Sequence, residues 1–199
     1  KGEINRAGKA LISEIPSSEK YTTALEIINK WRASHKRPLQ EISEELSKRA
    51  SNIDPLAIFA YRLKRLPSIQ DKLFRLKSTR LSSMQDIGGC RAILETPQQV
   101  YSLLEVYLDF ESRKSNDKPS QITTVDYISQ PKPSGYRSLH LIVSCESSET
   151  ENIFPAHRIE IQIRSRLQHN WATAVETAAA FLGQGLKSSI GDRSWLRFF

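Results

Sequence analysis

Apolar residues recur at helical spacing in the first part of the chain. Those between Ala24 and Trp31 stand three or four positions apart, which predicts a helix with one buried face. Pro38 indicates a break before a second helix over residues 39–50, because proline disfavours a helical residue before it. A turn is expected at residues 52–55. The N-terminal region is therefore predicted to be helical.

Two shorter helices are expected next along the chain. The first covers residues 56–66. Pro67 opens the second, since proline is favoured in the first turn of a helix. The inner face of this second helix is predicted to carry Ile69, Leu73 and Leu76.

The pattern changes to that of strands at Ile87. Residues 88–94 are small and apolar, as expected of a strand that is buried on both faces. Thr96 and Pro97 then suit the N-cap and the first position of a helix over residues 98–110.

Two further strands are expected over residues 122–128 and 138–144. Residues 129–135 separate them and are rich in turn formers. The polar stretches 111–120 and 146–152 are expected to be loops.

Residues 158–164 alternate strictly between apolar and polar side chains. The isoleucines of this segment share one face of a predicted strand, and Glu160, Gln162 and Arg164 share the other. An Ala-rich helix is expected over residues 165–182. Strands interleaved with helices indicate an α/β or α+β domain behind a helical N-terminal region.

The composition is that of an ordinary globular protein. The chain has 199 residues, 39% of them hydrophobic and 26% charged. No apolar run approaches the roughly 18 residues that cross a bilayer, and the first residues do not form a secretory signal. Cys90 and Cys145 lie in apolar segments and are expected to be buried free thiols. A cytoplasmic location without membrane contact is the default expectation.

Positive charge is concentrated in the first 80 residues. These hold 17 Lys and Arg against 9 Asp and Glu, whereas the rest of the chain holds 12 against 13. The segment 62–80 has seven basic residues, and its one acid is Asp71. Such a concentration attracts phosphates of a nucleotide or a nucleic acid, and the alternative is a solvated helix face.

Two acids have positions that suit metal binding or proton transfer. Asp86 stands just before the buried strand, and Glu160 lies on the polar face of the alternating strand. Carboxylates at strand ends commonly hold Mg²⁺ beside nucleotide phosphates. If the polar face lines a cleft, Glu160 is a metal ligand or a general base, and otherwise it faces solvent.

The loop 131–140 places an aromatic and a histidine beside turn-forming residues. Tyr136 can stack on a nucleic-acid base, and its alternative is a half-buried strand tyrosine. His140 taken alone is more often a core histidine than a catalyst.

Four motifs together resemble the RelA/SpoT-type alarmone synthetase family. They are Arg62-x-Lys64-x-x-x-Ser68-x-x-x-Lys72, Asp86-Ile87-Gly88-Gly89-Cys90-Arg91, Pro131-Lys132 with Gly135-Tyr136-Arg137-Ser138-Leu139-His140, and Glu160-Ile161-Gln162-Ile163-Arg164. They occur in the family's order over about residues 60–176. The resemblance implies a pyrophosphokinase with a mixed sheet flanked by helices, similar to DNA polymerase beta-like nucleotidyltransferases. Nothing resembles the family's hydrolase module, so alarmone hydrolysis is not expected.

The resemblance also implies which residues bind ATP. Arg62 and Arg91 would sandwich the adenine. The phosphates would be held by Lys64, Ser68 and Lys72, whose spacing of four also predicts one shared helix face. Asp86 would bind Mg²⁺, and Glu160 would share the metal or take the proton of the attacking 3′-hydroxyl.

The acceptor site follows from the same resemblance. Tyr136 would stack on the acceptor base, with Lys132, His140 and Gln162 near the acceptor, while Arg164 braces the site. The reaction would be an in-line attack on the β-phosphorus of ATP, with AMP leaving.

Three segments are expected along the chain. Residues 1–55 form a helical region packed on the catalytic domain, and residues 56–185 form the synthetase domain. Residues 186–199 end on apolar side chains, so they are expected to begin a segment that continues in the intact protein.

The identity of the acceptor stays open. GDP or GTP is one reading, and the 3′ end of tRNA or an adenine nucleotide is another. Residues 166–176 resemble toxin-like members of the family, and Ser134 replaces a frequent Asn of the loop. Basic residues outside the ATP site could serve RNA: Lys30, Arg32, Lys36, Arg37, Lys48 and Arg49. A homo-oligomer and a neutralising partner protein are further alternatives. A non-catalytic module that only binds a nucleotide or RNA is another, and Asp86 and Glu160 disfavour it.

Overall fold

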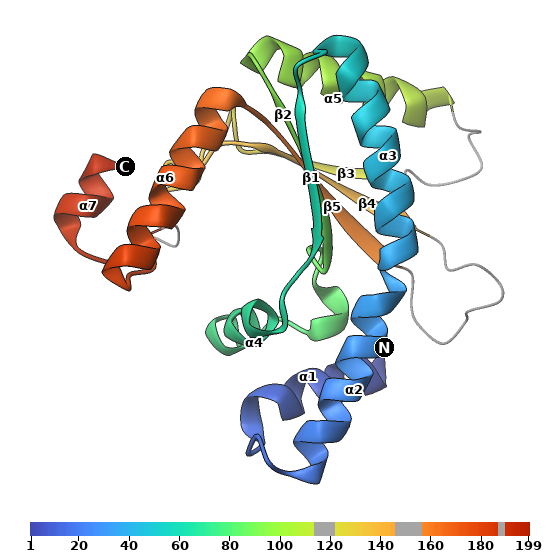
Figure 1. Cartoon of the computed structure of the whole chain (residues 1–199), viewed down its shortest axis with the longest axis vertical. Helices are drawn as coiled ribbons and strands as arrows, with labels where there is room; N and C mark the ends of the chain where they lie inside the picture. The colour runs from blue at the N-terminus through green and yellow to red at the C-terminus, as the bar shows by residue number, and fades with distance from the viewer. Residues whose placement is uncertain (114–121, 146–156, 187–189) are drawn as a thin grey trace. The chain divides into compact units, whose positions relative to one another are not determined.

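The computed structural model describes residues 1–113, 122–145, 157–186 and 190–199. The loop predicted over residues 146–152 and the part 114–120 of the loop predicted over 111–120 lie outside them. Residues 111–113 are helical, so the prediction of a loop is wrong for these three residues. Figure 1 traces the elements along the chain. The helices are α1 (Gly2–Ser13), α2 (Glu19–Ser34), α3 (Lys36–Ile53), α4 (Leu66–Arg75), the short η1 (Leu81–Ser83), α5 (Pro97–Arg113), α6 (Arg166–Leu182) and α7 (Arg193–Phe198). The strands are β1 (Ile58–Leu63), β2 (Gly88–Leu94), β3 (Ile122–Asp126), β4 (Leu139–Cys145) and β5 (His157–Ser165).

The strands form one five-stranded mixed sheet in the order β1-β2-β5-β4-β3. Its combination with flanking helices confirms the predicted fold class. The chain divides into two compact units. Unit 1 comprises residues 1–44, 61–90 and 142–160, and unit 2 comprises residues 45–60, 91–141 and 161–199. Strands β1, β2, β4 and β5 therefore contribute residues to both units.

The N-terminal helices form a hydrophobic cluster in unit 1. Helices α1 and α2 lie side by side (Figure 1) and bury Leu11 against the predicted apolar face of α2. On that face Ala24, Ile28 and Trp31 are at most 3% exposed. The side chain of Ser18 caps α2 by accepting a hydrogen bond from the backbone of residue 21 at 3.2 Å. The predicted helix with one buried face is confirmed.

The second long helix begins earlier than predicted. Helix α3 starts at Lys36 and includes Pro38, where the pattern predicted a break. Proline is accommodated because the N–H groups of the first turn have no intrahelical acceptor. The break lies instead at His35, which ends α2. Its carbonyl accepts a hydrogen bond from the backbone N–H of Leu39 at 3.0 Å.

The helix predicted over residues 56–66 is wrong, because Ile58–Leu63 form strand β1. This segment is short and holds β-branched and aromatic residues, so its apolar spacing fits either element. Strand β1 lies at an edge of the sheet beside β2, and that pairing decides the matter. As an edge strand, β1 leaves side chains such as Tyr61 exposed.

Helix α4 buries Ile69 and Leu73 as predicted, but two details differ. Leu76 is 44% exposed and caps the end of the helix rather than joining its inner face. Lys64 precedes the helix, whose N-cap is Arg65, so Lys64 does not share a helical face with later residues.

The two central strands match their sequence patterns. Most residues of β2 are buried, as expected of a strand covered on both faces. In β5 the isoleucines Ile159, Ile161 and Ile163 are fully buried. Helix α6 follows with a capping box between Ser165 and Gln168 and ends at Gly183, where φ is 63°.

The remaining sequence features are also found. Thr96 caps α5 by accepting a hydrogen bond from the backbone of Gln99 at 3.3 Å. Cys90 is a buried free thiol, as predicted, whereas Cys145 is a free thiol that is only half-buried. None of the helices built from the described residues combines the length and apolar character needed to traverse a lipid bilayer.

Candidate functional site

The carboxylate of Asp86 lies between two ammonium groups in unit 1. The Nζ of Lys64 donates to its Oδ2 at 2.9 Å, and the Nζ of Lys72 donates to its Oδ1 at 2.9 Å. Lys64 follows β1, where its backbone N–H donates to the carbonyl of Ile87 at 2.8 Å. Lys72 comes from α4. The two lysines thus reach Asp86 from different elements rather than from one helix face.

The electrostatics of Asp86 combine two opposing effects. Burial acts to raise the pKa of this carboxyl group. The hydrogen bonds and positive charges of Lys64 and Lys72 act in the other direction, and the net result is a pKa below the ordinary value of 3.8. Asp86 is therefore ionised at neutral pH, and the cluster carries a net positive charge.

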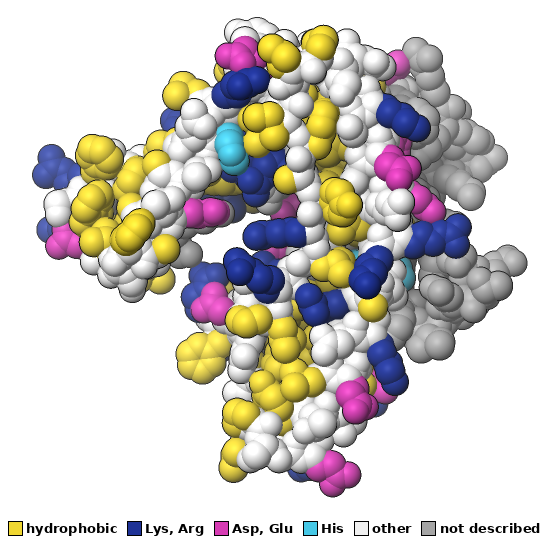
Figure 2. Space-filling model, viewed as in Figure 1, with side chains coloured by type: hydrophobic (Ala, Val, Ile, Leu, Met, Phe, Trp, Pro, Cys, Tyr) yellow, Lys and Arg dark blue, Asp and Glu magenta, His cyan; other side chains and the backbone are white. Residues whose placement is uncertain are grey.

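Two further residues of the predicted ATP site, Arg62 and Ser68, lie near Lys64 and Lys72 in the sequence. Arg62 is exposed on β1, and Ser68 is half-buried on α4, one turn before Lys72. In Figure 2, Lys and Arg side chains gather beside the end of β1 and the start of α4. The concentration of positive charge predicted from sequence is thus a surface of unit 1.

Glu160 lies on β5, half-buried, next to strand β2. Its backbone carbonyl is 3.6 Å from where a Cβ on Gly89 would stand. Its charge also reaches Cys90. Burial raises the pKa of this thiol to about 12, a hydrogen bond with Ser43 acts in the opposite direction, and the charge of Glu160 adds a smaller increase. Unit 1 therefore holds both predicted acids, Asp86 and Glu160.

The chemistry of the two predicted acids can be compared with the requirements of a magnesium ion that arrives with a nucleotide. Within the described ranges no group of three or more His, Cys, Asp or Glu side chains could hold a metal by itself. Mg²⁺ is usually bound by one or two carboxylates together with substrate phosphates and water. Asp86 and Glu160 are carboxylates of the kind that such a site uses, and both belong to unit 1.

In unit 2, the predicted acceptor loop forms an aromatic cluster. The hydroxyl of Tyr136 and the Nε2 of His140 are 2.9 Å apart. Tyr127 makes edge contacts with both rings, at centroid distances of 6.1 and 5.1 Å. The ammonium of Lys132 lies 4.3 Å from the centroid of Tyr127 and 5.2 Å from that of Tyr136.

The loop conformation explains how Lys132 comes to lie over these rings. The backbone N–H of Gly135 donates to the carbonyl of Lys132 at 2.8 Å, and the N–H of Lys132 donates to the carbonyl of Tyr136 at 3.2 Å. Gly135 has φ 81°, and an added Cβ would lie 3.0 Å from Trp171. Glycine is required here for both reasons.

Gln162 and Arg164 lie side by side on β5 in unit 2. The guanidinium of Arg164 donates to the Oε1 of Gln162 at 2.7 Å and lies 5.9 Å from the ring centroid of Tyr136. Arg164 is only 2% exposed. The guanidinium therefore contacts Gln162 and lies near Tyr136, two of the residues predicted for the acceptor site.

Arg91, on β2, offers an unused donor. It is half-buried, and its Nε is shielded from solvent without a hydrogen-bond acceptor in the described portion of the chain. A buried donor that lacks an acceptor is unfavourable, so a ligand is one way to satisfy it.

The structure divides the predicted site residues between the two units, and it joins Lys64 and Lys72 to Asp86 in unit 1 and Lys132 and His140 to Tyr136 in unit 2. Unit 1 holds Arg62, Lys64, Ser68, Lys72, Asp86 and Glu160, and unit 2 holds Arg91, Lys132, Tyr136, His140 and Gln162. Sequence reasoning missed Tyr127, which contacts three of the predicted residues in unit 2. Its position at the end of a predicted strand, just before the loop, was the available signal.

Comparison with known proteins places the chain in a family. Residues 61–182, more than half of the chain, match the family described as "Region found in RelA / SpoT proteins". The chain is 31% identical over 126 residues to GTP pyrophosphokinase YwaC of Bacillus subtilis, covering 60% of this chain and 56% of YwaC. It is 32% identical over 108 residues to probable GTP diphosphokinase RSH2, chloroplastic, of Oryza sativa, covering 54% of this chain and 13% of that protein.

Solved structures show the same fold. Small alarmone synthetase 1 from Bacillus subtilis bound to its product pppGpp has a TM-score of 0.64 and 23% identity, covering 86% of this chain and 87% of that one. Small alarmone synthetase 2 from the same species has a TM-score of 0.56 and 24% identity, covering 90% and 88%. The curated relatives are longer, and the chain spans about half of YwaC and a small part of RSH2.

Proposed function

The chain belongs to the RelA/SpoT family, and on that premise we propose that it is a pyrophosphokinase that transfers the terminal pyrophosphate of ATP to the 3′-hydroxyl of GDP or GTP. The names of its relatives in Bacillus subtilis and rice support this activity. The pppGpp bound to small alarmone synthetase 1 supports a guanosine acceptor.

The observation that carries the proposal is the position of Asp86 between Lys64 and Lys72, 2.9 Å from each ammonium. One carboxylate neutralises only part of the charge of two lysines. Each ammonium also keeps further N–H donors, which suit phosphate oxygens. Ser68 adds a hydroxyl on the same helix as Lys72. These residues would bind the phosphates of ATP, while Arg62 and Arg91 would hold the adenine.

The aromatic cluster of unit 2 would bind the acceptor. Tyr136 is 4% exposed, and Lys132 lies over its ring. An acceptor base would take the place of Lys132 on this ring, and the freed ammonium would bind an acceptor phosphate. His140 would fix the orientation of Tyr136 through the 2.9 Å contact with its hydroxyl, and Gln162 would hydrogen-bond the acceptor.

The reaction is an in-line displacement at the β-phosphorus of ATP. A bond forms between the acceptor 3′-oxygen and the β-phosphorus, and the bond from that phosphorus to the oxygen shared with the α-phosphate breaks. The electron pair leaves with AMP, and the hydroxyl proton passes to the carboxylate of Glu160. Lys64 and Lys72 offset the negative charge of the phosphates, so the protein acts by positioning and by electrostatics.

Magnesium fits beside Asp86 and Glu160. A bound Mg²⁺ ion would neutralise phosphate charge and polarise the β-phosphoryl group. Asp86 would have to exchange one lysine contact for the metal, since both of its oxygens accept ammonium N–H groups.

A tRNA acceptor is the second candidate, because residues 166–176 resemble toxin-like family members. The basic N-terminal residues give it limited support. Arg37 pairs with Glu41, and the side chain of Arg32 donates to the carbonyl of Lys64 at 3.0 Å. Such internal contacts leave fewer cations for an RNA backbone, whose binding depends on phosphate contacts.

A transfer assay tests the proposal. ATP labelled on its β- and γ-phosphates is supplied with Mg²⁺ and, in parallel, with GDP, GTP, ADP or deacylated tRNA. Label in a guanosine product is expected. Label on tRNA alone would replace the proposal by the second candidate, and label on ADP alone would indicate an adenosine alarmone. Binding of ATP with no transfer to any acceptor would favour a non-catalytic module.

A further inference from the structure

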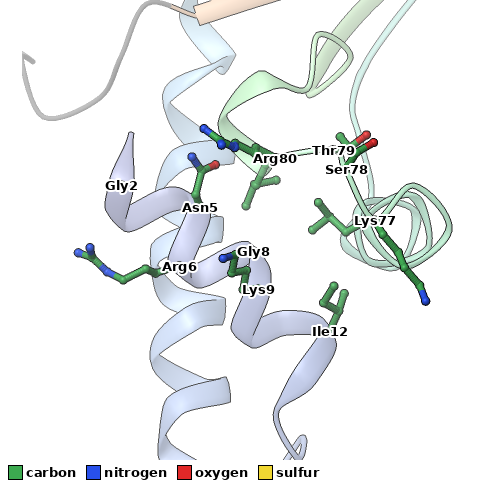
Figure 3. Close-up of a pocket in the computed structure, with 12 residues that line it drawn as sticks. Gly2, Asn5, Arg6, Gly8, Lys9, Ile12, Lys77, Ser78, Thr79 and Arg80 are labelled. Carbon is green, nitrogen blue, oxygen red and sulfur yellow. The ribbon is translucent and has the colours of Figure 1, made fainter.

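A pocket of about 540 Å³ lies in unit 1, separate from the cluster around Asp86. Residues of α1 line one side and the segment Lys77–Arg80, which follows α4, lines the other (Figure 3). Its volume is typical of sites for small molecules. None of Lys64, Ser68 and Lys72 belongs to its lining, so it is distinct from the proposed ATP phosphate site.

The lining of this pocket is strongly basic. Of its 12 residues, four are Lys or Arg, namely Arg6, Lys9, Lys77 and Arg80, and none is acidic. Asn5 and the hydroxyls of the 77–80 segment add neutral polar groups. Positive charge on opposite walls of a concave surface reinforces the potential inside it, because both walls attract the same anion.

The four cations differ from other basic residues of unit 1. Lys64 and Lys72 pair with Asp86, and Arg75 pairs with Asp71 at 3.1 Å. By contrast, none of the four pocket cations forms a side-chain ion pair or hydrogen bond with another part of the chain that the structure describes. Their charge therefore remains available to a ligand.

The walls of the pocket are held together by specific contacts. The backbone N–H of Ser82 donates to the Oδ1 of Asn5 at 3.0 Å. A Cβ on Gly8 would lie 2.8 Å from the Cβ of Leu81, so α1 approaches η1 as closely as glycine allows. The side chain of Gln70 on α4 also donates to the carbonyl of Leu11 at 3.1 Å. The cavity thus exists before a ligand binds, which lowers the entropic cost of binding.

We propose that this pocket binds the phosphate groups of a small ligand such as a free nucleotide or an inorganic polyphosphate. The cations supply charge-assisted hydrogen bonds to the phosphates, and the apolar side chains of Ile12, Leu73 and Leu81 contact the remainder of a nucleotide. In Figure 3, Arg6 and Lys77 extend outward. They are exposed, so they reach a ligand by rotamer changes, which are fast for surface side chains.

The pocket is close in sequence to the proposed ATP phosphate site. Leu73 and Lys77 line it and follow Lys72 on α4 and on the segment after it.

Calorimetric titration of the whole chain with tripolyphosphate tests the proposal. The double variant Lys77→Ala/Arg80→Ala is compared with the wild-type chain and with Lys20→Ala/Arg158→Ala. The control pair removes the same charge from exposed positions outside this pocket. The pocket variant is expected to lose one class of binding site, with affinity at least about tenfold weaker, while the control titrates like wild type.

Three outcomes would overturn the proposal. The pocket variant could titrate like wild type, or the control pair could lose as much affinity. In a parallel titration with a short single-stranded RNA, the pocket variant could lose RNA binding while tripolyphosphate binding is unchanged, which would indicate a nucleic-acid surface. Equal thermal midpoints establish that the variants fold. Lys9→Ala, on the opposite wall, repeats the test and is expected to weaken tripolyphosphate binding as well.

Discussion

The contacts of Asp86 with Lys64 and Lys72 limit the roles that this residue can have. Two ammonium groups at 2.9 Å keep it ionised in spite of burial, so it is both a counter-ion and a candidate metal ligand. Removal of its charge leaves Lys64 and Lys72 facing each other without compensation. Those lysines then repel each other but attract a phosphate more strongly.

Asp86→Asn and Glu160→Gln are therefore expected to separate turnover from binding. Transfer from labelled ATP should fall by at least about 100-fold in each variant, because a metal ligand or the general base is lost. Binding of ATP, measured by calorimetry without acceptor, should be largely retained. Asp71→Asn is the matched control, since this acid is 62% exposed and pairs with Arg75. Full transfer activity in Glu160→Gln would refute its assignment as metal ligand or base.

At the scale of elements, the junction between α2 and α3 depends on a neutral histidine. His35 is 1% exposed, and its Nδ1 lies 2.8 Å from the carbonyl of Trp31. Its ring also makes an edge contact with His157 on β5. Burial lowers the pKa of His35 from 6.5 to about 4. The hydrogen bond with the carbonyl of Trp31 acts to raise this pKa, and the charge of His157 acts to lower it further.

This shift predicts a pH dependence of stability. Between pH 6.5 and about 4 the unfolded chain binds a proton at residue 35 that the folded chain excludes, so stability falls as the pH falls. The loss is on the order of 3 kcal/mol across that window. His35→Gln should make the free energy of unfolding, measured in urea, much less dependent on pH there. The pKa of Asp86 is lowered from 3.8 in the folded chain, so the stability that Asp86 contributes is lost only at the acid end of this window and below it. An unchanged pH slope in the variant would contradict this explanation.

Strand β2 offers a matched pair of glycines for testing the packing of the sheet. A Cβ on Gly88 would lie 2.6 Å from the Cδ1 of Ile159, whereas a Cβ on Gly89 meets nothing closer than the carbonyl of Glu160 at 3.6 Å. Gly88→Ala should lower the free energy of unfolding by about 1–3 kcal/mol, and Gly89→Ala should be nearly neutral.

The substitution Ile159→Val tests the cause of the expected loss in Gly88→Ala, because it removes the Cδ1 methyl group that would clash with a Cβ at position 88. In combination with Gly88→Ala, it should recover part of the lost stability, as measured by urea unfolding. If Gly89→Ala destabilised the chain as much as Gly88→Ala, the cause would lie in the backbone rather than in the contact with Ile159.

At the scale of the whole molecule, the two units share four strands. Because β1, β2, β4 and β5 each contribute residues to both units, unfolding one unit disrupts strands of the other. One cooperative transition is therefore expected. The tryptophans report on it separately, since Trp31 is buried in unit 1 and Trp171 lies in unit 2.

Two single-tryptophan chains test this cooperativity. One keeps Trp31, the other keeps Trp171, and phenylalanine replaces the remaining tryptophans. Each chain is unfolded in urea and followed both by its tryptophan fluorescence and by circular dichroism. The fluorescence midpoint should coincide with the circular-dichroism midpoint of the same chain. A fluorescence transition that precedes the loss of secondary structure would show that the units unfold independently.

The sequence by itself determined those features that depend on neighbouring residues. The buried face of α2, the alternation of β5 and the cap of α5 follow from local periodicity and capping chemistry. The turn-forming residues 129–135 predicted the loop between β3 and β4 in the same way. These predictions were confirmed because each rests on interactions within a few positions of the chain.

Only the tertiary structure decided what depends on distant partners. Strand β1 is a strand because it pairs with β2, although its short apolar pattern also suited a helix. Lys64 and Lys72 meet at Asp86 from separate elements, across 22 and 14 positions of the chain. Tyr127 contacts residues of the acceptor loop that lie several positions later in the chain. Likewise, α1 forms the basic pocket together with the distant segment 77–80. Contacts between segments far apart in sequence depend on packing, which no local pattern of residues encodes.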